Sequence, residues 1–255
     1  MSLKCGIVGL PNVGKSTLFN ALTKAGISAE NYPFCTIDPN VGIVELPDSR
    51  LDKLSEIVQP QKIQSATVEF VDIAGLVAGA SKGEGLGNKF LANIRETDGI
   101  INMVRCFSDD NVVHVAGKVD PLSDIEVIQT ELALADLSTV EKAQQREGKL
   151  AKTGNKDAIK LCAFLEVVHA HLDEGKPARS LTLDKDEQQL LKPLCLLTAK
   201  PAIFVANIDG NGFENNPLLT RVQEYAASEG DLTAGLVVVN PAIEEATELR
   251  EQIAN

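Results

Sequence analysis

The stretch Gly9-Leu10-Pro11-Asn12-Val13-Gly14-Lys15-Ser16-Thr17 constrains this chain more than any other segment. It has the spacing G-x-x-x-x-G-K-[ST] of a phosphate-binding loop, and it lies between an apolar run, residues 5–8, and a helical pattern, residues 16–25. In such a loop the glycines let backbone N–H groups turn toward phosphate oxygens, and the following helix points its positive end at the same place. The motif predicts binding of a nucleoside triphosphate.

The side chains of this loop have distinct expected roles. Lys15 is expected to contact the β and γ phosphates, and Ser16 to bind Mg²⁺ through its hydroxyl. One hydroxyl is a typical contribution, because Mg²⁺ keeps most of its octahedral shell for water and phosphate oxygens. The nucleotide-binding residues predicted here are Asn12, Val13, Gly14, Lys15, Ser16 and Thr17.

Two further segments follow in the order that is typical of nucleotide switches. Residues 31–40, which contain prolines and asparagines, are predicted to form a loop in which Thr36 completes the Mg²⁺ shell; a plain surface turn is the alternative. A buried-looking strand, residues 67–71, ends in Asp72-Ile73-Ala74-Gly75, a D-x-x-G arrangement that is weak alone but strong in this order. Asp72 is expected to hold Mg²⁺ through a water, and Gly75 to offer its N–H to the γ-phosphate.

The residue that orients the attacking water is less evident. Many switch proteins carry a glutamine after the D-x-x-G glycine, but here Leu76 stands in that place and has no hydrogen-bonding group. His114, after the fourth strand, is our candidate for orienting or activating the water, with a structural histidine as the alternative. His169 and His171 lie two residues apart on a predicted helix, so we expect surface residues on different faces rather than a metal pair.

The corner that recognises the base is predicted after the fifth strand. GTP-specific P-loop proteins carry N-K-x-D there, because the aspartate accepts two hydrogen bonds from the guanine edge. This chain has Asn207-Ile208-Asp209-Gly210, in which the carboxylate comes one place early. Asn207 and Ile208 are therefore predicted to bind the nucleotide, but selectivity for guanine is not supported.

Strand and helix patterns alternate along the chain. Besides residues 5–8 and 67–71, apolar runs predict strands over 41–46, 99–107, 201–207 and 235–240. This alternation predicts an α/β fold of the P-loop NTPase class, with a mostly parallel sheet covered by helices on both faces. Residues 48–58 are predicted to form an amphipathic helix that packs on the sheet through Leu51, Leu54 and Ile57.

Two long periodic stretches interrupt this pattern. Residues 123–150 and 157–172 predict an antiparallel helical pair, with a capping box of Ser123 and Glu126 at the start of its first helix. We therefore divide the chain into a nucleotide-binding domain, residues 1–122 and 200–255, and a helical insertion, residues 123–199.

Composition limits the class of protein. The 36 acidic and 24 basic residues give a formal net charge of −12, which argues against broad nucleic-acid binding but leaves room for a local basic patch, and we expect no sequence-specific DNA binding. The apolar runs are shorter than the roughly 18 to 20 residues of a membrane span, and the start shows no signal-peptide core, so we expect a cytoplasmic protein without membrane contact. The five scattered cysteines suggest neither disulfides nor a zinc site.

Taken together, these motifs resemble the YchF (Obg-like ATPase) family of translation-factor-related P-loop proteins. The resemblance is carried by residues 6–17, 31–36, 72–90 and 212–217 and covers the chain to about residue 230. It implies a GTPase-like fold that prefers ATP, a hydrophobic residue in place of the glutamine, a coiled-coil insertion and association with ribosomes. It also links Asn12 to a bound K⁺ that serves in place of an arginine finger.

The chain departs from the family pattern at two places. The family motif at the base corner is N-x-x-E, whereas Gly210 stands here where the glutamate is expected. The family also continues into a C-terminal TGS domain, which we expect to be absent because the sequence stops at Asn255 and residues from 231 onward match poorly.

Three functions are compatible with the sequence. We predict slow, Mg²⁺-dependent hydrolysis of ATP, with GTP weaker or comparable, which drives a ribosome-associated conformational switch. The alternative is a nucleotide-gated module that binds a protein or the ribosome with negligible hydrolysis, and the missing glutamine favours it. A P-loop kinase is disfavoured because no second substrate-binding lid is evident and the glycine-rich segment after Asp72 is typical of a switch.

Overall fold

The computed structural model describes residues 3–23, 40–73, 86–109, 112–115, 117–210, 214–229 and 234–240. Residues 31–39 of the predicted loop 31–40, with Thr36, and the segment of Gly75 and Leu76 lie outside these ranges.

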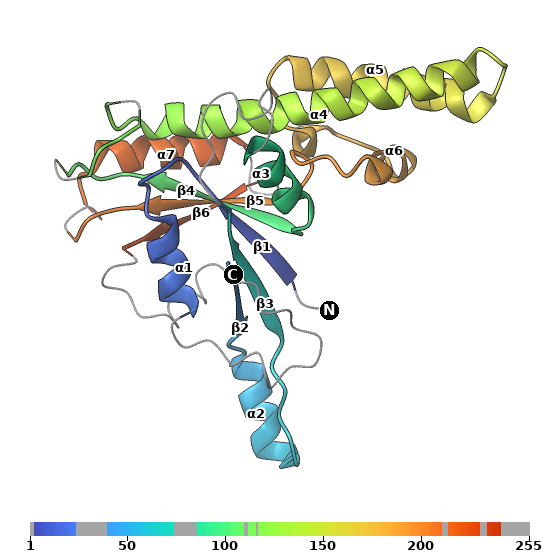
Figure 1. Ribbon diagram of the computed structural model, residues 1–255. Coiled ribbons are helices and arrows are strands. Elements are labelled where there is room, and N and C mark those ends of the chain that lie inside the picture. The colour runs from blue at the N-terminus through green and yellow to red at the C-terminus, as the bar shows by residue number, and fades with distance from the viewer. Residues whose placement is uncertain are drawn as a thin grey trace.

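The described residues form one six-stranded sheet in the order β2-β3-β1-β4-β5-β6 (Figure 1). Its strands are β1 Leu3–Val8, β2 Val41–Glu45, β3 Thr67–Asp72, β4 Gly99–Arg105, β5 Ala202–Asn207 and β6 Ala234–Val239. All neighbouring pairs are parallel except β2 and β3, which are antiparallel. The prediction of a mostly parallel sheet is confirmed, and one edge strand makes the sheet mixed.

Helices cover both faces of this sheet. They are α1 Lys15–Thr23, α2 Ser49–Val58, α3 Leu86–Arg95, α4 Pro121–Ala151, α5 Lys156–Asp173, α6 Lys185–Leu191 and α7 Pro217–Glu229, with short 3₁₀ turns η2 Ala178–Ser180 and η3 Lys192–Leu194. Figure 1 shows α4 and α7 along one face and α1 on the other. Continuous apolar strands such as β4 suit this position, because both of their faces are buried. Ile100 and Ile101, which point to opposite faces, are 4% and 1% exposed.

The helix predicted at residues 48–58 is present as α2, but the prediction that it packs on the sheet is wrong. Its residues are exposed or half-buried, and Leu54 and Ile57 are 56% and 80% exposed. The reason is topological: β2 and β3 are antiparallel neighbours, so the segment between them needs no crossover over a sheet face. Figure 1 accordingly shows α2 beyond the far end of these two strands.

The start of α4 also differs from the prediction. The helix begins at Pro121, with Asp120 at the N-cap, so Ser123 and Glu126 lie inside the helix and the predicted capping box is wrong. Proline suits the first helical position, because its missing N–H is not needed there.

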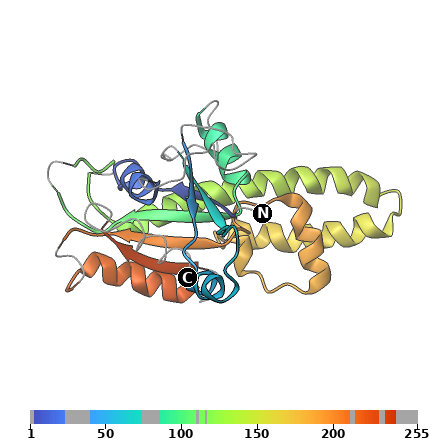
Figure 2. The same cartoon turned by 90° about the horizontal axis from the view of Figure 1, so that it is seen from below.

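Helices α4 and α5 form the predicted pair and run back along each other (Figures 1 and 2). Asn155 caps α5 by accepting hydrogen bonds from the backbone N–H groups of Asp157 and Ala158. Between the helices lie buried apolar side chains, among them Val140, Leu165 and Val168. The coiled-coil geometry of the pair and its separation as a domain of residues 123–199 stay predictions.

One buried carboxylate joins the middle of α4 to the chain that re-enters the sheet at β5. Asp136 is 1% exposed and accepts hydrogen bonds from the backbone N–H groups of Leu197 and Thr198, both at 2.8 Å, and from Thr198 Oγ1 at 2.7 Å. Thr198 Oγ1 accepts in turn from the N–H of Ala178. Burial raises the pKa of Asp136, and these donors oppose that shift because they favour the charged form.

We expect Asp136→Asn to lower the free energy of unfolding by about 2 to 3 kcal/mol, because an amide has one acceptor oxygen and leaves buried donors unpaired. Urea unfolding followed by circular dichroism measures this change. The control is Asp186→Asn, whose exposed side chain faces Lys160 at 3.5 Å, and which should change the value by less than about 0.5 kcal/mol. Equal unfolding free energies for the two variants would contradict the stabilising role of the Asp136 hydrogen bonds.

Candidate functional site

The phosphate-binding loop connects β1 to α1, as predicted. Asn12 and Gly14 have φ angles of 63° and 103°, in the left-handed region. Gly14 meets a second constraint, because a Cβ at this position would clash with the side-chain amide of Asn207. That amide donates a 2.9 Å hydrogen bond to the carbonyl oxygen of Val13. The glycine therefore allows the end of β5 to contact the loop directly.

The side chain of Lys15 packs against the phosphate-binding loop. Its side chain is buried, and Nζ donates a 2.8 Å hydrogen bond to the carbonyl oxygen of Leu10. Burial lowers the pKa of Lys15, and the nearby carboxylate of Asp72 opposes this shift. An ammonium has three N–H donors, so the bond to Leu10 uses only part of its capacity to bind phosphate oxygens.

Ser16 and Asp72 meet at the start of α1. Ser16 Oγ donates a 3.0 Å hydrogen bond to Asp72 Oδ2, although 56 positions separate the two residues. Hydroxyl and carboxylate oxygens are the ligands that Mg²⁺ prefers. Among the described residues, no three His, Cys, Asp or Glu side chains gather as a metal site. The pair fits Mg²⁺, which takes few protein ligands beside a triphosphate.

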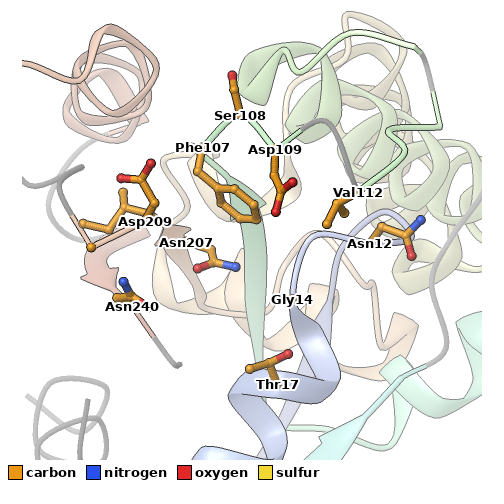
Figure 3. A pocket seen from close by; sticks show the side chains of 12 residues that line it. Asn12, Gly14, Thr17, Phe107, Ser108, Asp109, Val112, Asn207, Asp209 and Asn240 are labelled. Atoms are coloured by element: carbon orange, nitrogen blue, oxygen red, sulfur yellow. The ribbon is translucent and has the colours of Figure 1, made fainter. Parts of the chain in front are cut away.

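A cavity of about 710 Å³ opens beside the loop (Figure 3). Its size is that of a pocket for a small molecule or cofactor. It is lined by Asn12, Gly14, Thr17, Phe107, Ser108, Asp109, Val112, Asn207, Ile208, Asp209, Gly210 and Asn240. The cavity therefore lies beyond the carboxyl ends of β4, β5 and β6, where ligands bind in open α/β sheets.

The predicted nucleotide-binding residues come together around this cavity. Asn12, Gly14 and Thr17 meet Asn207 and Ile208 there, although β5 is far from the loop in sequence. Asp209 also lines the cavity and is exposed, whereas the Asn207 amide is engaged by the loop. At Gly210, an added Cβ would have no described atom within 4 Å, so the space accepts a longer side chain.

Sequence reasoning missed the wall of the cavity that Phe107, Ser108, Asp109 and Val112 form, because it gave these residues no role in binding. Figure 3 shows Asp109 and Val112 across the opening from Asp209 and Asn240, with Phe107 between Asp209 and Asp109. The position of the wall residues in the sequence could have indicated this role. They directly follow a parallel strand, and ligands of open α/β sheets bind beyond the carboxyl ends of the strands.

Arg105, at the end of β4, holds this wall in place. It is 1% exposed, and its guanidinium donates to the carbonyl oxygens of Phe107, Val112 and Asp109 at 3.1, 2.9 and 3.2 Å. Its Cζ also lies 4.5 Å from the centre of the Phe107 ring. A planar fork of N–H donors can satisfy three carbonyls at once, which a single ammonium cannot do.

His114 lies beside the phosphate-binding loop but points into the protein. The neighbouring carbonyl of Val113 accepts a 3.0 Å hydrogen bond from Asn12 Nδ2. The His114 ring is buried, and its Nε2 lies 3.0 Å from Asp124 Oδ2 of α4. Burial raises the pKa of Asp124, and the hydrogen bond to His114 opposes the shift. The role predicted for His114 in orienting the attacking water stays a prediction.

The other two histidines are partly exposed. His169 Nε2 lies 3.7 Å from Glu141 Oε1, and His171 Nε2 lies 2.8 Å from Ser180 Oγ. They have different neighbours because residues two apart on a helix point in different directions.

Comparison with known proteins agrees with this geometry. Residues 4–140 match the family profile described as "50S ribosome-binding GTPase". The chain is 61% identical over 253 residues to the "Ribosome-binding ATPase YchF" of Haemophilus influenzae, covering 99% of this chain and 69% of that protein. It is 55% identical over 250 residues to the protein of the same name from Bacillus subtilis, covering 96% and 67%.

A solved structure extends this similarity to the fold. The Schizosaccharomyces pombe YchF GTPase superposes with a TM-score of 0.81 at 37% identity, covering 98% of this chain and 68% of that chain. Among the described residues, no helix combines the length and apolar character needed to cross a membrane.

We expect Arg105→Lys to weaken binding of a nucleoside triphosphate by about 10-fold, equal to about 1.4 kcal/mol. The reason is that an ammonium cannot hold the three carbonyls of Phe107, Asp109 and Val112 that fix this wall. Calorimetric titration with a non-hydrolysable ATP analogue measures the affinity. The matched control is Arg50→Lys, because Arg50 is 86% exposed and pairs with Asp48 on α2. A loss of the same size in both variants would rule out the role of Arg105.

Proposed function

Because the chain belongs to the YchF family, we propose that it is a Mg²⁺-dependent ATPase that acts as a ribosome-associated conformational switch. The observation that carries the proposal is the meeting of Ser16 and Asp72, 3.0 Å apart, beside the buried ammonium of Lys15. Binding and hydrolysis of a triphosphate require positioning and charge stabilisation more than covalent chemistry, and these residues supply both.

Each residue has a proposed task. The backbone of residues 12–17 cradles the phosphates, and Lys15 neutralises charge on the β and γ groups. Ser16 binds the metal directly and Asp72 holds it through a water. Thr36 and Gly75 are proposed to sense the γ-phosphate. Bound Mg²⁺ stabilises the charge that develops on the phosphate oxygens during transfer.

A second cation is proposed at Asn12. The Nδ2 of this residue donates to the Val113 carbonyl, so its Oδ1 is the side-chain atom that can coordinate K⁺. A cation at that place would supply charge stabilisation of the kind that an arginine finger gives.

ATP is the preferred nucleotide in this proposal. The carboxylate of Asp209 precedes the place from which N-K-x-D proteins bind guanine, and the cavity carries no glutamate at Gly210. The relatives are named ATPases, whereas the S. pombe protein is described as a GTPase, so we propose a modest preference with GTP weaker or comparable.

A chain of contacts supports the switching part of the proposal. Lys200 Nζ donates to the carbonyl oxygens of Arg95 and Thr97, at the end of α3, which follows the D-x-x-G segment. Two residues earlier, Thr198 is bonded to Asp136 of α4. Movement of α3 would therefore reach the helical pair, which we propose as an insertion of residues 123–199 that contacts the ribosome.

The alternative is a nucleotide-gated binding module with negligible hydrolysis. Two observations favour it: Leu76 occupies the place of the water-orienting glutamine, and the Nε2 of His114 is engaged by Asp124. In this case nucleotide binding alone would control the affinity for the ribosome.

We expect phosphate release from ATP with Mg²⁺ at a slow rate, and a loss of at least about 100-fold when Lys15 is replaced by alanine or the metal is chelated. A phosphate-release assay with ATP and GTP, with and without ribosomes, measures turnover and preference. Adding Gly210→Glu should shift the preference further toward ATP. If the parent chain released phosphate no faster than Lys15→Ala but bound ribosomes in an ATP-dependent way, the ATPase would be contradicted and the binding module supported.

We expect His114→Ala to lower kcat by about 100-fold and to leave KM unchanged, if His114 orients the water and Asp124 orients His114. Asp124→Asn should give a smaller loss and shift the pH profile of kcat, because it changes the partner of the imidazole. Steady-state kinetics and thermal unfolding of the same samples separate catalysis from folding. Unchanged turnover in a folded His114→Ala variant would assign a structural role to this histidine.

A further inference from the structure

A second cavity lies away from the nucleotide site, where residues before and within α6 meet the segment that leads into β5. We call it the α6 pocket. Its volume is about 290 Å³, and the described residues that line it all differ from those of the first cavity. This size is near the lower limit of roughly 300 Å³ for pockets that hold small molecules. The α6 pocket therefore suits the end of a chain better than a whole nucleotide.

Hydrogen bonds within the protein fix the walls of the α6 pocket. In the segment after α5, the N–H of Arg179 donates to the carbonyl oxygen of Thr198 at 3.0 Å, and the N–H of Ala178 donates to Thr198 Oγ1 at 3.0 Å. Helix α6 begins with a capping box, in which Asp184 accepts from the N–H of Glu187 and Glu187 accepts from the N–H of Asp184. A pocket whose walls are already ordered binds a ligand without the entropic cost of ordering them.

Most of the lining of the α6 pocket is apolar. Its apolar residues are Ala178, Leu181, Leu183, Leu191, Ala199 and Pro201. The three leucines are half-buried, and they pack against the apolar cluster of the helical pair. An aliphatic group that entered the pocket would remove their remaining exposed area from water, which contributes about 25 cal/mol for each Å² of apolar surface.

Arg179 is the one charged residue among the described residues that line the α6 pocket, and it is half-buried. The carboxylates at the start of α6 have other contacts: Asp184 and Glu187 form the capping box, and Asp186 lies 3.5 Å from Lys160. A guanidinium presents its N–H donors in a planar fork that matches both oxygens of a carboxylate. The pocket therefore favours a carboxylate that carries an aliphatic group.

Gln188 of α6 adds a hydrogen-bonding group that a fatty acid would not use. Its Nε2 donates to the carbonyl oxygen of Leu183 at 3.3 Å, which orients the side-chain amide. The Oε1 atom of the same amide accepts hydrogen bonds from N–H groups. A fatty acid has no N–H group, whereas the last peptide bond of a polypeptide carries one close to the terminal carboxylate. The combination of Arg179 and Gln188 therefore favours the end of a polypeptide.

We propose that the α6 pocket binds the carboxyl terminus of a partner polypeptide whose last residue is aliphatic. The terminal carboxylate pairs with Arg179, the last N–H donates to Gln188 Oε1, and the aliphatic side chain packs on Leu181, Leu183 and Leu191. Capture of a terminal carboxylate is a recurrent mode of peptide recognition. The inference goes beyond the proposed ATPase, because it assigns a protein partner to a pocket that the nucleotide does not use.

The test is fluorescence anisotropy of a fluorescein-labelled peptide, GSGSAL, titrated with the full chain. The peptide ends in leucine with a free carboxylate, and two matched peptides end in a leucine amide or in aspartate. The pocket variant is Arg179→Gln, and Arg179→Lys keeps the charge. The matched control is Arg50→Gln, because Arg50 is an exposed arginine of α2 whose replacement gives the same change in net charge.

The parent chain should bind the carboxylate peptide at least about 10-fold more tightly than the amide or the aspartate peptide. Arg179→Gln should weaken binding of the carboxylate peptide by about 10-fold, Arg179→Lys by less, and Arg50→Gln by no more than about twofold. The comparison of carboxylate and amide uses the unaltered chain, so it does not depend on the folding of a variant.

Three outcomes would overturn the proposal. The first is equal affinity for the carboxylate and amide peptides, or a Kd for the carboxylate peptide above about 1 mM. The second is an equal loss in Arg179→Gln and Arg50→Gln, which would assign binding to net charge. The third is displacement of the labelled peptide by decanoate at a lower concentration than by unlabelled peptide, which would assign the pocket to a fatty acid.

Discussion

The hydrogen bond from the Asn207 amide to the Val13 carbonyl joins the two ends of the candidate site. It is possible only because Gly14 has no side chain at the point of approach. Since β4 lies between β1 and β5 in the sheet, this contact spans the end of β4, and the residues that follow β4 complete the wall of the cavity. The register of three parallel strands therefore sets the distance between the phosphate-binding loop and the corner at residues 207–210.

Helix α4 connects this site to the rest of the molecule. Its first turn carries Asp124, which holds His114 beside the phosphate-binding loop. Ile128 and Leu132 pack it into the core of the sheet, and Asp136 ties it to the strand that returns at β5. Beyond that anchor, Val140 and Ala143 of α4 belong to the apolar cluster that includes Leu165 and Val168 of α5. One continuous helix therefore extends from the neighbourhood of the phosphate-binding loop to the free end of the helical pair.

Positive charge in this acidic chain is concentrated at two places, the phosphate-binding loop and the free end of the helical pair. The net charge of −12 disfavours nonspecific binding of polyanions to the protein. The phosphate-binding loop relies instead on backbone N–H groups and on one buried ammonium, that of Lys15. Residues 142–160, in contrast, carry exposed Lys and Arg side chains at the free end of the helical pair. One buried ammonium thus lies beside the phosphate-binding loop, while exposed cations gather near the far end of α4.

The sequence by itself determined the phosphate-binding loop and the positions of most strands and helices, because spacing within a short segment dictates local backbone geometry. It also identified Ser16 and Asp72, which the structure brings together, from the motifs in which they occur. Only the tertiary structure decided which surface each element faces. It placed Leu54 and Ile57 of α2 in solvent, made Arg105 the support of a cavity wall and engaged His114 with Asp124. These contacts depend on strand register and on the antiparallel pairing of β2 with β3. Such pairings bring together residues that are far apart in the sequence, and the sequence separation of two residues does not predict their distance in space.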